Sequence, residues 1–182
     1  MGKKANNFQS RSILQLFSLF LVVFFLISFV ENTSAQKPNF TGSWAYNQTK
    51  SDQQQGGGRG FGGGGTMNIK QEGNNLNVDR VFTTQDGEQR TMSSKYTLDG
   101  KESVNTIGGD RGGSSKSIAK WSADNKSLNI AINTSFQMNG ETREMKSDQV
   151  WTLTDGGKTL TVVTTGTGRN GAYTRKAVYD KK

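Results

Sequence analysis

The chain has 182 residues, of which 31% are hydrophobic and 21% are charged, and its formal net charge is +8 at pH 7. It contains neither histidine nor cysteine, which excludes Ser-His-Asp and Cys-His catalysis, the usual zinc sites and an imidazole proton shuttle. Without cysteine the chain forms no disulfide and carries no lipid-modified cysteine, so burial and hydrogen bonds have to stabilise the fold.

Residues 1–35 have the composition of an export signal. Three basic residues precede an apolar run over 13–30, and the small residues Thr33 and Ala35 fit the minus-three and minus-one positions of a signal-peptidase site. The alternative is an uncleaved membrane anchor, because eighteen residues reach the lower limit for crossing a bilayer. We expect an apolar signal helix, cleavage before Gln36, and a secreted or periplasmic protein that touches a membrane only through an uncleaved signal.

Residues 36–182 are expected to form one domain, because their number suits a single core. Cleavage would remove three basic residues and one acidic residue and leave a net charge of +6. The remaining basic residues are scattered along the sequence. This pattern favours a solvated surface, or contact with anionic lipid, polysaccharide or acidic ligands, over a nucleic-acid partner.

The domain alternates short runs rich in Thr, Val, Ile and aromatic residues with Gly, Asn and Asp turns, such as Asp86-Gly87, Asp99-Gly100 and Asn139-Gly140. Such pairs supply the positive φ of tight hairpins, and no segment has the helical periodicity that parallel crossovers need. The segments 120–130 and 150–162 also repeat a Trp, an Asp turn and a Lys-Ser/Thr-Leu sequence, as successive hairpins would. We predict an antiparallel meander with strands near 40–46, 66–72, 76–84, 89–98, 102–107, 114–121, 127–138, 141–153, 159–167 and 172–179.

Period-two alternation gives these strands one apolar and one polar face. Arg80 shares its parity with Leu76, Val78 and Phe82, which points it into the predicted interior. A buried guanidinium needs an internal carboxylate or an anionic ligand. The alternative is that Arg80 reaches water at the strand end, or that a bulge shifts the register. Arg143 presents the same choice.

Residues 53–65 include the tract "GGGRGFGGGG" at 56–65, which has the composition of an RNA-binding segment. We interpret it instead as a loop between the first two strands, because an exported protein rarely meets RNA and glycines offer no side chains to pack. Extracellular DNA binding, or a lid formed by Arg59 and Phe61, are the alternatives.

The segment "NFTGSWAYNQTKS" carries Phe40, Gly42 and Trp44 in the spacing Phe-x-Gly-x-Trp. This motif resembles the opening signature of the calycins, the lipocalins and fatty-acid-binding proteins, in which the Trp closes the bottom of a barrel. The later segments "YTLDGKES", "AKWSADNKSLNI" and "QVWTLTDGGKTLTV" are similar to the hairpins of lipocalin-like proteins exported by bacteria. The resemblance implies an all-β fold: a closed, antiparallel up-and-down β-barrel of about eight to ten strands around an apolar ligand.

Fatty-acid-binding proteins hold the ligand carboxylate with an Arg-x-Tyr motif on the last strand. Here Arg175 and Tyr179 are four residues apart, so they share a face but depart from that motif. Our candidate ligand-binding residues are Arg80, Trp44, Tyr96, Phe136, Arg175 and Tyr179. We predict no catalytic residue, cofactor or metal.

Three functions remain at this point. The first is a non-enzymatic barrel that binds a small hydrophobic or amphipathic ligand, and the second is an envelope or matrix protein whose filled barrel acts through its polar, basic surface. The third, a hydrolase, would need two inward carboxylates close together. The alternation places Asp79 and Asp148 outward, so we do not expect an enzyme.

Overall fold

The computed structural model describes residues 36–52, 65–84, 87–107, 112–138, 140–168 and 171–182. The predicted signal segment, and residues 53–64 of the glycine-rich segment with Arg59 and Phe61, lie outside these residues. Within the ranges described, no helix combines the length and the hydropathy needed to cross a membrane.

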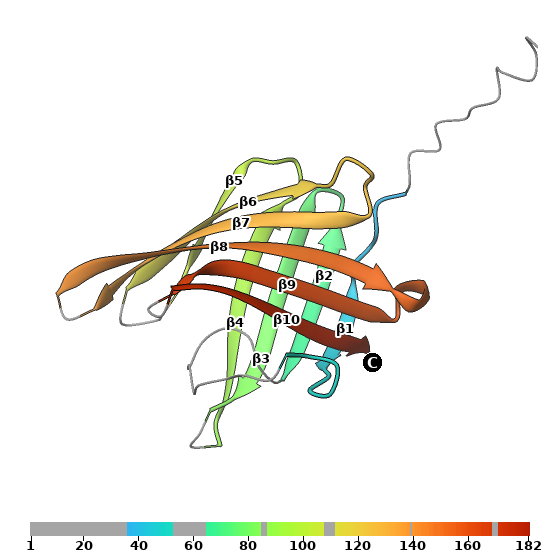
Figure 1. Ribbon diagram of the computed structural model, residues 1–182, viewed down its shortest axis with the longest axis horizontal. Helices are drawn as coiled ribbons and strands as arrows, with labels where there is room; N and C mark the ends of the chain where they lie inside the picture. The colour runs from blue at the N-terminus through green and yellow to red at the C-terminus, as the bar shows by residue number, and fades with distance from the viewer. Residues whose placement is uncertain (1–35, 53–64, 85–86, 108–111, 139, 169–170) are drawn as a thin grey trace, which may run out of the picture. The chain divides into compact units, whose positions relative to one another are not determined.

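Ten strands form one antiparallel sheet in the unit Ala35–Lys182 (Figure 1). They are β1(Gly42–Tyr46), β2(Thr66–Glu72), β3(Asn75–Thr83), β4(Gln89–Thr97), β5(Glu102–Thr106), β6(Gly113–Trp121), β7(Ser127–Met138), β8(Glu141–Thr154), β9(Thr159–Gly168) and β10(Gly171–Lys181), with the short 3-10 turn η2(Asp155–Gly157) between β8 and β9. Their order in the sheet is β4-β3-β2-β1-β10-β9-β8-β7-β6-β5. This confirms the predicted up-and-down, all-β fold.

The first and last strands differ most from their predicted bounds. β1 begins at Gly42, because Phe40 packs into the core and does not pair with a neighbouring strand. β10 continues to Lys181, which pairs with Trp44 of β1. This pairing joins the two ends of the domain and brings β1 between β2 and β10.

The barrel is nearly closed rather than fully closed as the resemblance implies, because the ladder is interrupted between β4 and β5. Side chains of β5 replace the missing ladder. Asn105 Oδ1 accepts a hydrogen bond from the Lys95 amide at 2.7 Å, and Asn105 Nδ2 donates to the Lys95 carbonyl at 3.0 Å. Ser103 Oγ accepts from the Thr97 amide at 2.9 Å. An amide side chain thus takes the place of a peptide group along this edge.

The core fills one end of the barrel, which we call the packed end, where the β2–β3, β4–β5, β6–β7 and β8–β9 turns lie. The side chains of Phe40, Trp44 and Trp151 are fully buried there. The Phe40 ring stacks on Trp121 at 5.9 Å and meets Trp151 edge-on at 5.8 Å, and Trp44 Nε1 donates to the Phe40 carbonyl at 2.9 Å. Phe40 therefore closes this end from below.

The inward faces predicted by alternation are confirmed for the residues of the packed end: Met67, Ile69, Leu76, Val78, Tyr96, Leu98, Leu128, Ile130, Trp151, Leu160 and Val162 are all buried. Towards the opposite end, which we call the exposed end, the inward side chains are less buried. Arg80, Phe82, Met92, Ile132, Gln149 and Tyr173 are only half-buried. Solvent therefore reaches the inner wall in this half.

A candidate ligand-binding surface inside the barrel

Arg80 lies on the inner wall at the boundary between the two halves. It pairs with Met67 on one side and Met92 on the other, and Met67 is 1% exposed, so the three side chains share the inner face. The Arg80 guanidinium crosses the barrel from β3 and lies 5.9 Å from the ring centroid of Trp151 on β8. The inward direction predicted from parity is therefore present, and no bulge shifts the register.

The Arg80 guanidinium has no carboxylate or hydrogen-bond acceptor within range among the described residues. Its contact there is with the face of the Trp151 ring, a cation–π interaction that leaves the N–H donors in the guanidinium plane unused. Trp151 Nε1 donates to Gln149 Oε1 at 3.0 Å, which fixes the indole beneath the cation. A half-buried cation with unused donors is a favourable place for an anionic group.

Tyr179 provides a second polar group beside Arg80. Its ring meets Tyr46 edge-on at 5.6 Å. Burial raises the pKa of Tyr179 above 10.0, although the nearby positive charge of Arg80 partly offsets that shift. The phenol therefore keeps its proton at neutral pH and remains a donor. No hydrogen-bond acceptor for it lies among the described residues.

The predicted site residues occupy three kinds of place. Trp44 is fully buried and Tyr96 is 6% exposed, so both belong to the core of the packed end. Phe136 is half-buried near the β7–β8 hairpin, and Arg175 is exposed on β10 with its guanidinium 5.1 Å from the Tyr173 ring. The structure thus places Tyr179 near enough to Arg80 to feel its charge, and it places Trp44 in the same cross-strand row as Arg80 but inside the core. A ligand contact by any of the six remains a prediction.

Sequence reasoning missed Trp151 as a neighbour of Arg80, and Gln149 as the hydrogen-bond acceptor of the Trp151 indole. The inward parity of Trp151 was visible, but its contact with Arg80 joins β3 to β8, which are five places apart in the sheet. Only the closure of the barrel brings these strands face to face.

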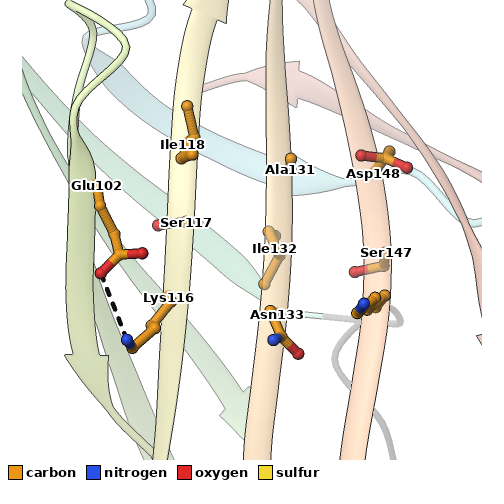
Figure 2. A pocket seen from close by; sticks show the side chains of 10 residues that line it. Glu102, Lys116, Ser117, Ile118, Ala131, Ile132, Asn133, Ser147 and Asp148 are labelled. Atoms are coloured by element: carbon orange, nitrogen blue, oxygen red, sulfur yellow. Dashed lines mark ion pairs between the residues drawn. The ribbon is translucent and has the colours of Figure 1, made fainter.

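A separate hollow of about 280 Å³ lies on the outer face of the sheet, over β5 to β8 (Figure 2). Its floor is Ala131, which stands between Ile118 and Asp148 in one cross-strand row. Lys116 Nζ lies 3.6 Å from Glu102 at its margin. The hollow arises because the methyl group of Ala131 occupies a position flanked by longer side chains. No sequence signal pointed to it.

The described part of the chain holds no group of three acidic residues, histidines or cysteines that could bind a metal ion. Apart from Glu141 at the β7–β8 hairpin, its carboxylates lie in turns or loops or on the outer face of the sheet. Asp79, for example, accepts a hydrogen bond from Ser93 Oγ at 2.6 Å in solvent. The fold and the inner wall together define an antiparallel, nearly closed β-barrel with one packed half and one accessible half.

No protein-family model matches the chain, and no curated protein matches it. Among solved structures, the chain is similar to the zebrafish ileal bile acid-binding protein in complex with cholic acid, with 16% sequence identity. The alignment covers 79% of this chain and 98% of that chain, with a TM-score of 0.47. A likeness at this level does not bear on what this chain binds.

Proposed function

We propose that this protein is a non-enzymatic, exported barrel that binds a small amphipathic anion in its accessible half. The observation that carries the proposal is Arg80, a half-buried inward cation with no carboxylate partner among the described residues. The composition of residues 1–35 supports export.

Recognition of the ligand would combine charge with apolar contact. The acidic group of the ligand meets the guanidinium of Arg80 and the protonated hydroxyl of Tyr179, and charge-assisted hydrogen bonds to such a pair are among the stronger polar contacts in proteins. Its apolar body lies along the half-buried side chains of Phe82, Met92 and Ile132, which lose solvent contact when it binds.

The second candidate is a scaffold whose barrel is filled and whose basic outer surface makes the functional contacts. The full burial of Trp44, Phe40 and Trp151 at the packed end favours it, since half of the interior has no room for a ligand. In that case Arg80 is solvated by water at the inner wall and binds no organic anion.

Isothermal titration calorimetry with decanoate and decanol distinguishes the two. We expect the wild-type protein to bind both, and Arg80→Met to weaken decanoate binding roughly 10- to 100-fold while decanol binding stays unchanged. Methionine keeps the length and apolar stem of the side chain and removes the charge. The matched control is Arg143→Met, because Arg143 is exposed at the β7–β8 hairpin and pairs with Glu141 at 2.9 Å. Binding of neither compound would refute ligand binding and favour the scaffold.

A further inference from the structure

The inner wall carries a second arginine, Arg175 on β10. It shares the parity of Ala177 and Tyr179, which pack in or against the core. Arg175 pairs with Thr164 of β9, which pairs in turn with Gln149 of β8. Gln149 is the residue that accepts the hydrogen bond of the Trp151 indole. Arg175 is exposed and its guanidinium stacks on Tyr173, 5.1 Å from the ring centroid, with no ion pair among the described residues. It therefore resembles Arg80 in its surroundings but lies nearer the exposed end.

The Tyr173 side chain lies close to the backbone of β9. A methyl group built on Gly166, the cross-strand partner of Tyr173, would lie 2.8 Å from the Tyr173 hydroxyl oxygen. The tyrosine side chain thus lies flat over a glycine of β9 and offers its face to Arg175. The Arg175 guanidinium and the Tyr173 ring therefore lie together on the inner wall as a cation–π pair.

The charge on this wall is not balanced. Among the described strands, the one acidic residue with inward parity is Glu141, at the tip of the β7–β8 hairpin, and it pairs with Arg143. The inward Arg90 pairs with Glu88 beyond the end of its strand. Lys181 also has inward parity, but it lies over Trp44 at the packed end, 5.3 Å from the ring centroid. Arg80 and Arg175 are thus the two inward cations of the accessible half that no described carboxylate neutralises.

The two cations lie at separate depths. Trp151 pairs with Val162, Val162 pairs with Ala177, and Arg175 is two residues beyond Ala177. Two strand spacings and one two-residue step put the Arg175 Cα about 12 Å from the Trp151 Cα. The Arg80 guanidinium lies over Trp151, 5.9 Å from its ring centroid, whereas the Arg175 guanidinium lies over Tyr173, 5.1 Å from that ring centroid. The two cations are therefore held on different aromatic rings of the inner wall, where two acidic groups can bind them separately.

We propose that the ligand is a dianionic amphipath, an elongated apolar molecule with one acidic group at each end. This inference rests on the proposed function. The inner acidic group binds Arg80 and Tyr179, the outer one binds Arg175, and the apolar segment between them covers the half-buried residues of the wall. A molecule with one acidic group uses only the deeper cation.

Calorimetry with decanoate and decanedioate tests this, because the two compounds share chain length and differ in the second carboxylate. We expect the wild-type protein to bind decanedioate about fivefold more tightly than decanoate, the modest factor reflecting the solvent exposure of Arg175. Arg175→Met should abolish this preference and leave decanoate affinity unchanged, whereas Arg175→Lys should keep part of it.

The matched control is Lys176→Met, which removes one positive charge from the neighbouring position on the outer face of β10 and should preserve the preference. If Arg175→Met does not fold, salt provides a second test: the wild-type preference for the diacid should fall as ionic strength rises. Equal affinities for the two acids in the wild type, or a preference unchanged in Arg175→Met, would overturn the dianion and leave the proposed function standing. Binding of neither acid would overturn both.

Discussion

The interruption between β4 and β5 predicts a specific weakness at Asn105. Its side chain makes two hydrogen bonds to the Lys95 peptide, at 2.7 Å and 3.0 Å, where a neighbouring strand would otherwise supply them. Asn105→Ala leaves both backbone groups without a protein partner. At about 0.5–1.5 kcal/mol for each bond, and with solvent as a replacement, the loss should be about 1–2 kcal/mol of unfolding free energy. For a domain of this size that corresponds to a fall of about 0.5–1 M in the urea midpoint.

Urea denaturation and amide hydrogen exchange measure this directly. We expect the Lys95 amide to exchange faster in Asn105→Ala, and the unpaired edge to make the variant more prone to aggregation. Thr106→Ala is the control, because Thr106 lies on the same strand with its side chain exposed. The reasoning is wrong if both variants show the same midpoint and the same protection at Lys95.

Two further predictions concern the packed end and the pH dependence of stability. Phe40→Ala removes a fully buried ring and should lower the unfolding free energy by about 3–5 kcal/mol in chemical denaturation. The control is Val104→Ala, at a residue that is 63% exposed, which should change the unfolding free energy by less than about 0.5 kcal/mol. Equal losses in the two variants would contradict the packing of Phe40. A hydrogen bond from Asn47 and the charge of Lys50 hold the pKa of Asp180 below 3.8. The stabilisation from these two contacts is therefore present above pH 3.8 and lost as pH falls through the folded-state pKa of Asp180. Asp180→Asn should accordingly lower the urea midpoint at neutral pH but not in acid. A fall in the midpoint that is the same at every pH would contradict this.

The strands could be predicted because each depends on local signals. Alternation sets the faces, and Asp-Gly or Asn-Gly pairs set the turns: Gly100 and Gly140 have φ of +81° and +80°, the region glycine favours. The exact ends of β1 and β10 could not be predicted, because the pairing of Trp44 with Lys181 joins residues at opposite ends of the domain.

The interrupted ladder and the outer hollow also depend on long-range register. Asn105 is a polar residue at an inward position of β5, in the row of Ser115 and Thr134, and nothing local shows that its amide replaces a peptide group. Ala131 leaves a hollow only because Ile118 and Asp148 are its cross-strand neighbours.

The candidate site could be predicted from the sequence only in part. Parity alone placed Arg80 inward, since its neighbours Val78 and Phe82 define the face. Its contact with Trp151 and its position beside Tyr179 required the closed arrangement of strands from both ends of the sequence. The inward charge was predictable, whereas its surroundings were not.

The ionisation of a bound ligand tests most directly whether Arg80 meets an acidic group. Carboxyl-labelled decanoate bound to the protein can be titrated by ¹³C NMR in the wild type and in Arg80→Met. We predict that the bound carboxyl ionises at a lower pH in the wild type than in the variant, because the guanidinium stabilises the carboxylate. Identical titration curves in the two proteins would show that the acidic group lies elsewhere and would contradict the account.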